Sequence, residues 1–72
     1  MKEDNEAITR SKADFYFKEK IKVHINFKTG YWKRGIILEV SSDFFTLDET
    51  LEGKQPIFFS QISSIEKYRE SK

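Results

Sequence analysis

The sequence predicts an all-β fold with a short N-terminal α-helix, in which five short antiparallel strands form a strongly bent barrel. Five β-prone segments joined by tight turns follow one another within about 50 residues, which is typical of a small barrel. Gly35, inside the second segment, marks a place where a strand bends or another backbone comes close. A chain of 72 residues without cysteine is expected to form a single domain with neither a disulfide nor a thiolate metal site.

The segment before the strands predicts a helix over about residues 6–17. The polar residues 1–5 precede it and are expected to be disordered up to an Asp or Asn that caps the helix. Two alternatives stay open: a helix that begins at Ser11, or a chain that is already extended from Phe15. The apolar stripe of this helix is weak and consists of Ile8, Ser11, Lys12 and Phe15.

The first two strands carry the clearest patterns of the chain. From residue 21 to residue 28 apolar and polar side chains alternate without a break, which is the period of a strand with one buried face. Gly30 then supplies a turn in which it can take a positive φ. The next strand runs over about residues 31–40, and its expected core face consists of Ile36, Leu38 and Val40.

Three further strands complete the barrel, which is expected to span about residues 20–68. The third covers about residues 44–47, and an acidic loop follows it. The fourth covers residues 55–59, where Pro56 at the start suits an edge strand or the entrance of a strand, because proline has no N–H to donate. The fifth covers about residues 62–68.

The net charge of +1 conceals two blocks of opposite sign. Residues 18–35 contain six basic and one acidic side chain, whereas residues 39–53 contain five acidic and no basic side chains. Two interpretations stay open: the charges mix again in space on a solvated surface, or a basic binding surface lies beside an acidic one.

Catalysis, metal binding and membrane insertion find no support in the sequence. His24 is the only histidine, and its place on the polar face of a strand predicts an ordinary exposed residue. The acidic residues lie mostly in turns, where they are common for conformational reasons. No apolar run approaches the roughly 20 residues of a membrane span, and no signal peptide opens the chain. We therefore expect a soluble, cytoplasmic protein that is not an enzyme and that uses no metal or cofactor.

Two segments favour binding. Residues 31–34 combine two rings with two cations, and rings can stack on bases while Lys and Arg contact phosphate. Alternatively, Tyr31 or Trp32 covers one end of the barrel. Phe58 and Phe59 lie on opposite faces of a strand, so one ring belongs to the core and the other is a candidate subunit contact.

Several short motifs resemble a known family. Residues 18–37 combine a Lys-Glu-Lys lead-in, an alternating strand, Gly30 and a second glycine five residues later, and they are similar to the first half of an Sm-like (LSm) domain, in detail that of the bacterial Hfq family. Gly53-Lys54-Gln55, Ile57-Phe58 and Ile62-Ser63-Ser64-Ile65 resemble the second Sm motif as that family has it. The resemblance covers about residues 6–66. It implies a homo-hexameric or homo-heptameric ring, closed by strand four of one subunit pairing with strand five of the next, that binds single-stranded RNA as an RNA chaperone.

The resemblance also implies roles for individual residues. The distal-type RNA-binding residues would be Asn26, Gly30, Tyr31, Trp32, Lys33 and Arg34, and the rim-type residues would be Lys18 and Lys20. The pore-side residues would be Asp43, Phe44, Phe59 and Ser60, where Phe59-Ser60 replaces the Lys-His pair of the family. The expected subunit interface consists of Phe58, Phe59, Ile62 and Ile65.

Three functional hypotheses follow from these patterns. In the first, the chain is a ring-forming RNA-binding protein that uses aromatic stacking and phosphate contacts. In the second, it is an Sm-like module for assembly or protein contacts that has lost the usual RNA pocket, as the replaced Lys-His pair suggests. In the third, it is an SH3-like barrel that is fused or docked to a larger assembly and is a monomer in solution.

Overall fold

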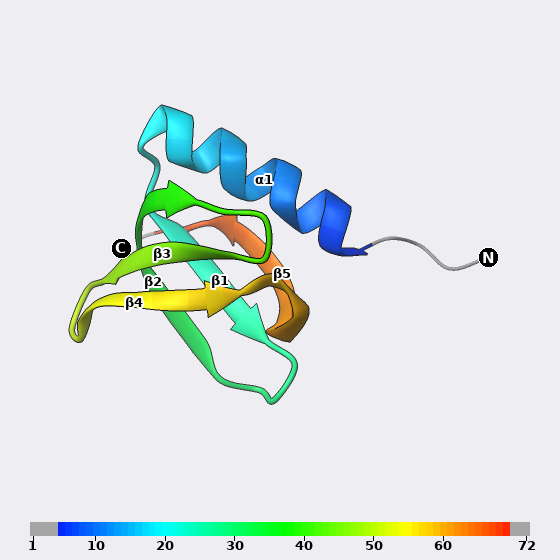
Figure 1. Cartoon of the computed structure of the whole chain (residues 1–72). Helices are drawn as coiled ribbons and strands as arrows, with labels where there is room; N and C mark the ends of the chain where they lie inside the picture. The colour runs from blue at the N-terminus through cyan, green and yellow to red at the C-terminus, as the bar shows by residue number, and fades with distance from the viewer. Residues whose placement is uncertain (1–4, 70–72) are drawn as a thin grey trace.

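The computed structural model describes residues 5–69, and Figure 1 shows a helix lying against a five-stranded antiparallel sheet that bends strongly. The predicted fold class is therefore confirmed. Of residues 1–5, for which disorder is predicted, residues 1–4 lie outside the described residues, and for Asn5 the prediction is wrong, because α1 begins there. The elements are α1 (Asn5–Glu19), β1 (Val23–Phe27), β2 (Trp32–Val40), β3 (Phe44–Glu49), β4 (Gly53–Phe58), the 3-10 turn η1 (Phe59–Gln61) and β5 (Ile62–Lys67).

The end of α1 is fixed by its backbone. The N–H of Lys20 donates to the carbonyl of Phe17 at 3.2 Å, and the N–H of Ile21 donates to the carbonyl of Tyr16 at 3.0 Å. This is the pattern of a Schellman cap, in which the residue after the helix takes a left-handed conformation. Lys20 does so with a φ of 56°, at a position that usually holds glycine. The helix therefore continues past the predicted residue 17.

The face that α1 turns toward the sheet differs from the predicted stripe. The helix runs without interruption, so the start at Ser11 and the extended chain from Phe15 are both wrong. Thr9 and Ala13 are buried, whereas Ile8 and Phe15 are 51% and 55% exposed. Thr9 and Ala13 are four residues apart and therefore lie on one face of the helix. Their small side chains let that face lie close to the sheet. The predicted stripe of Ile8, Ser11, Lys12 and Phe15 is therefore the outer side of the helix.

The strand order leaves two free edges. The sheet runs β4-β3-β2-β1-β5, so β4 and β5 each lack one neighbour. Pro56 lies opposite Thr46 in the middle of β4 rather than near its start. The N–H of Phe59 donates to the carbonyl of Asp43 at 3.0 Å, so Phe59 belongs to a hydrogen-bonded pair of the ladder with β3. Hydrogen-bonded and non-hydrogen-bonded pairs alternate along an antiparallel ladder, so the backbone nitrogen and carbonyl of Pro56, three residues earlier, point away from β3 to the free edge. The edge position predicted for Pro56 is confirmed, and the proline costs no hydrogen bond of the sheet.

A bulge in β2 changes which residues face the core. The ladder with β3 shifts register between Ile37 and Glu39, which places one extra residue in β2. Ile37 is buried, Leu38 is 40% exposed, and Val40 packs against the core. The predicted core face is therefore wrong for Ile36 and Leu38 and confirmed for Val40, because the extra residue reverses the alternation between Ile37 and Val40.

The core contains one of the two neighbouring phenylalanines. Phe59 is 1% exposed and its ring lies 5.5 Å from that of Phe45, whereas Phe58 is 43% exposed. The predicted division of these two rings between core and surface is confirmed. The predicted fourth strand ended at Phe59, but β4 ends one residue earlier and Phe59 begins η1. No helix within residues 5–69 combines the length and the apolar character needed to cross a membrane.

Candidate nucleic-acid interface

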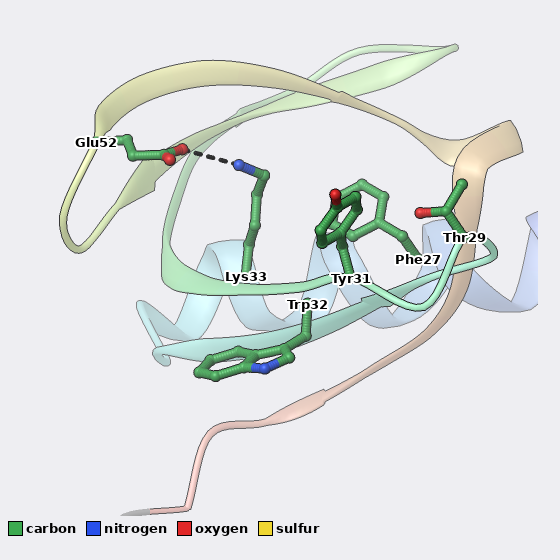
Figure 2. Close-up of a pocket in the computed structure, with 6 residues that line it drawn as sticks. All are labelled: Phe27, Thr29, Tyr31, Trp32, Lys33 and Glu52. Atoms are coloured by element: carbon green, nitrogen blue, oxygen red, sulfur yellow. Dashed lines mark hydrogen bonds and ion pairs between the residues drawn. The ribbon is translucent and has the colours of Figure 1, made fainter.

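The aromatic and basic segment Tyr31–Arg34 is divided between two surfaces. Successive side chains of a strand point to opposite faces, so Trp32 and Arg34 leave β2 on one side and Lys33 on the other. Figure 2 shows Tyr31 and Lys33 on one side of the strand and Trp32 on the opposite side. Four of the six residues of the expected distal-type site therefore belong to two neighbouring surfaces.

The first surface is an open pocket beside the β1–β2 turn. Its volume is about 340 Å³, and a second hollow of about 370 Å³ adjoins it and shares three of its residues, Phe27, Thr29 and Tyr31. Figure 2 shows the Tyr31 ring standing in front of Phe27. Tyr31 is 76% exposed, which leaves most of its ring free for contact with a planar ligand. The residues that line the pocket are Phe27, Thr29, Tyr31, Trp32, Lys33 and Glu52.

The turn that presents Tyr31 is tight. The N–H of Phe27 donates to the carbonyl of Tyr31 at 2.8 Å, and the N–H of Gly30 donates to the carbonyl of Phe27 at 2.9 Å. Gly30 has a φ of +100°, so the positive φ predicted for this glycine is confirmed. Gly30 thus acts on the pocket through the backbone, because it has no side chain to contact a ligand.

The charged wall of the pocket joins the two charge blocks of the sequence. Lys33 Nζ donates to Glu52 Oε1 at 2.8 Å, and Gln55 Nε2 donates to the same oxygen at 3.0 Å. The ammonium of Lys33, followed by the Gln55 hydrogen bond, holds the pKa of Glu52 below its ordinary value of 4.5. At this wall a basic and an acidic block therefore mix in space, as the first interpretation of the charge pattern expects.

A second carboxylate fixes the turn that carries Glu52. Glu49 is 8% exposed, and its Oε1 accepts the backbone N–H groups of Leu51 and Glu52, each at 2.7 Å. The hydrogen bond from the Glu52 N–H holds the pKa of Glu49 below its ordinary value of 4.5, although burial acts in the opposite direction. Sequence reasoning missed this role, because an acid in a turn has many local uses.

Glu49 makes the stability of the fold depend on pH. A carboxyl whose pKa is lowered by folding stabilises the protein above its unfolded pKa, and that contribution is lost as the pH falls through the folded pKa. Glu49→Gln, which keeps an acceptor oxygen but removes the charge, is expected to lower Tm at pH 7 and to differ less from wild type at pH 3. Thermal unfolding followed by circular dichroism checks this, with exposed Glu39→Gln as control. Equal Tm differences at both pH values would contradict it.

The second surface is a stack of rings on the outer face of β1, β2 and β5. The His24 ring lies 4.8 Å from that of Trp32 at an interplanar angle of 11°, and 6.4 Å from that of Tyr68 at 12°. The guanidinium of Arg34 lies 5.5 Å from the Trp32 ring centre and 5.8 Å from that of Tyr68. Lys22 Nζ lies 4.8 Å from the Tyr68 ring centre. Three nearly parallel rings and two cations therefore share one surface.

His24 and Asn26 take part in this surface. The expectation that His24 is an ordinary exposed residue is wrong, because its ring is half-buried between Trp32 and Tyr68. Its Nε2 lies 3.3 Å from Asn26 Oδ1, and Asn26 Nδ2 donates to Ser64 Oγ at 3.1 Å. Asn26 thus ties the stack to β5. Sequence reasoning missed His24 and Tyr68, because the stack requires β1 to lie between β2 and β5.

The rim-type residues lie where α1 ends. Lys18 is largely exposed, and its Nζ lies 3.2 Å from Asp14 Oδ2 one helical turn earlier. Lys20 is exposed in the cap of the helix. Both cations therefore reach solvent, although Lys18 has an acidic partner.

The pore-side residues do not form a pocket together. Asp43 and Ser60 are exposed, and the half-buried Phe44 lies 5.4 Å from Phe58, ring centre to ring centre. Phe59 belongs to the core and cannot contact a ligand at the surface. The cation at this place is Arg10, which sequence reasoning missed: its guanidinium lies 5.1 Å from the Phe59 ring centre, and its Nε donates to the carbonyl of Ser42 at 3.2 Å.

The expected interface residues also divide. Phe59, Ile62 and Ile65 are 1%, 4% and 1% exposed within the single chain, so their side chains cannot cover a neighbouring subunit. Of the four expected residues only Phe58 presents its ring to solvent. Within residues 5–69 no group of three or more His, Asp or Glu side chains could hold a metal ion.

Comparison with known proteins bears on the fold. The sequence matches no protein-family model and no curated protein. Among solved structures, the 1.55 Å crystal structure of the pleiotropic translational regulator Hfq matches 81% of this chain and 95% of its own, with a TM-score of 0.71 and 19% sequence identity. The chain has the Sm-like fold of Hfq. At this identity the likeness to Hfq concerns the fold, and the side chains of this chain decide what its surfaces bind.

Proposed function

We propose that this chain is an Sm-like protein that binds single-stranded RNA through the pocket beside the β1–β2 turn. The exposed Tyr31 ring carries the proposal, because it stands over a hollow walled by Phe27 and Lys33. A base stacks on Tyr31, and Lys28, which lines the adjoining hollow, neutralises phosphate. Glu52 holds Lys33 in place and accepts hydrogen bonds, which favours a base with an exocyclic amino group over one without.

We further propose that copies of the chain assemble into a homo-hexameric or homo-heptameric ring. The free edges of β4 and β5 support this, because an unpaired edge can pair with a strand of another copy. Pro56 in the middle of β4 removes one outward donor, so β4 offers fewer hydrogen bonds than a regular edge. Phe58 supplies an apolar contact beside that edge.

Native mass spectrometry with and without short oligo-A and oligo-U tests both proposals. We expect one closed oligomer and binding of oligo-A by that oligomer. A monomer at micromolar concentration would contradict the ring, and failure of both oligonucleotides to bind would contradict the RNA-binding function. A ring that binds neither would support the alternative, an assembly or protein-interaction module, which is favoured by the burial of Phe59 and the exposure of Phe58.

Removing the Tyr31 ring isolates its part in binding. Tyr31→Ala is expected to weaken binding of oligo-A by about 1 kcal/mol or more, the value of one base stacked on an aromatic ring. Because Tyr31 is mostly exposed, Tm should change little. Fluorescence anisotropy measures the affinity, and Leu51→Ala, which removes an 80% exposed apolar side chain outside the pocket lining, is the matched control. Equal affinities of Tyr31→Ala and wild type would exclude Tyr31 as the base platform.

A further inference from the structure

The outer stack holds a cation, Arg34, that has no acidic partner within residues 5–69. Arg34 is half-buried, and its guanidinium lies against the rings of Trp32 and Tyr68. Within residues 5–69 neither Arg34 nor Lys22 forms an ion pair with a carboxylate. Lys33, the residue before Arg34 on the same strand, contrasts with them because Glu52 compensates its charge.

The acidic residue opposite His24 on β5 already has a basic partner. Glu66 lies opposite His24 on β5, and its Oε2 lies 3.9 Å from Lys12 Nζ on α1. Among the described residues, Lys22 and Arg34 therefore give the outer stack a net positive charge. A guanidinium fixed in one orientation is well suited to an anion with several oxygens, because its planar fork donates two parallel hydrogen bonds.

The rings of the stack contact one another and the cations. One face of Trp32 is stacked on His24, and Trp32 and Tyr68 both lie within cation–π distance of Arg34. Tyr68 contacts Lys22 in the same way. Rings in this arrangement fix the direction of the cations and reduce the entropy that a flexible side chain loses on binding.

We infer that the outer stack is a phosphate site that binds the backbone of a single-stranded RNA irrespective of its bases. Arg34 and Lys22 contact phosphate, and Trp32 and Tyr68 are positioning residues that hold these cations. The ligand class rests on the proposed function. The site differs from the Tyr31 pocket in Arg34, Lys22 and Tyr68, although Trp32 also lines that pocket. The side chains of Trp32 and Tyr31 leave β2 on opposite sides (Figure 2). One RNA strand is thus held by its bases at the pocket and by its backbone at the stack.

The experiment compares two ligands of equal length, an 18-nucleotide oligo-A and an abasic ribose-phosphate strand. Fluorescence anisotropy gives the affinity over a series of salt concentrations. The emission of Trp32, the only tryptophan of the chain, reports whether the ligand reaches the stack. The variants are Arg34→Gln, Trp32→Leu and Tyr31→Ala. Lys54→Gln, which removes an exposed cation of β4, is the control, and Tm of each variant checks the fold.

We expect wild type to bind both strands and the abasic strand to change the Trp32 emission. Arg34→Gln should weaken both strands by about tenfold and lower the salt slope by about 0.7 for each phosphate that is no longer neutralised. Trp32→Leu should also weaken both strands, because it releases Arg34, whereas Tyr31→Ala should weaken only oligo-A. Lys54→Gln should change the affinity for either strand much less than Arg34→Gln does.

Other results separate the inference from the proposed function. If Trp32→Leu weakens oligo-A and leaves the abasic strand unchanged, Trp32 stacks on a base and the inference is wrong. If oligo-A binds but the abasic strand does not, the inference is wrong and the proposed function stands. If the abasic strand binds as tightly as oligo-A, the phosphate site stands and base recognition at the Tyr31 pocket is wrong. Binding of neither strand overturns both.

Discussion

Phe59→Asp is expected to unfold the protein. Phe59 is 1% exposed and packs against Phe45 inside the chain and under Arg10 at the surface. Removing a buried phenylalanine ring costs about 3–5 kcal/mol, and a carboxylate left in its place adds the cost of desolvation. A chain of 72 residues has a total stability of about 4–11 kcal/mol. We therefore expect the variant to lack the circular dichroism spectrum of the folded protein at 25 °C.

Its neighbour supplies the control. Phe58→Asp introduces the same charge one residue earlier, on a ring that is 43% exposed, and the fold is expected to persist with Tm within a few degrees of wild type. If β4 forms the proposed subunit contact, the same variant should be monomeric in size-exclusion chromatography with light scattering. A folded Phe59→Asp protein would show that the core does not depend on this ring. A folded, fully oligomeric Phe58→Asp protein would remove Phe58 from the interface.

This pair also shows why loss of the Lys-His pair cannot be judged from the sequence alone. A phenylalanine at this position suggests a lost binding site, but it does not show where the ring points. In the structure the ring fills the core, and Arg10 of α1 lies over it. The contact joins residues 49 positions apart in the chain, so no local pattern predicts it. The sequence shows that Phe59-Ser60 replaces the pair, but it cannot show that the Arg10 side chain lies beside Phe59.

Features that depend on residues adjacent in the chain could be predicted from the sequence, whereas features that depend on distant residues could not. The alternation of β1 and the turn at Gly30 depend on adjacent residues, and both are confirmed. The core face of β2 depends on a bulge that forms against β3, and there a regular alternation gives the wrong face. The stack of His24 with Tyr68 depends on the β1–β5 pairing, which joins the two ends of the barrel.

The candidate site shows the same limit. The sequence identifies the rings and cations of Tyr31–Arg34, and the alternation of a strand divides them between the pocket and the outer stack (Figure 2). The partners that give each surface its chemistry come from elsewhere: Glu52 from the β3–β4 turn, and Tyr68 from the position directly after β5. Residue types could therefore be predicted, whereas their pairing required the fold.

Gly35 is the position where the smallest substitution is expected to have a large effect. Gly35 lies opposite Glu49 in the antiparallel pairing of β2 with β3. A Cβ atom at Gly35 would overlap the carbonyl oxygen of Asp48 and come close to the backbone of Glu49. The backbone of a paired strand cannot rotate away as a flexible side chain can, so the strands have to separate. The close approach predicted at this glycine is confirmed, and it has an energetic consequence.

Gly35→Ala is expected to destabilise the protein by about 3 kcal/mol, the upper range for overpacking, and to lower Tm by roughly 10–20 °C. Gly53→Ala is the matched control, because Gly53 has a φ of +86° but no atom within 4 Å of the added Cβ. It measures the strain of the positive φ without a steric overlap and should cost only about 1 kcal/mol. Thermal and urea unfolding of both variants give the two values. If Gly35→Ala costs no more than Gly53→Ala, β2 and β3 can move apart without loss, and the sharp bend of the sheet does not depend on this contact. If Gly35→Ala destabilises the protein more than Gly53→Ala does, the bend that brings β1, β2 and β5 onto one outer surface depends on the absence of a side chain at Gly35.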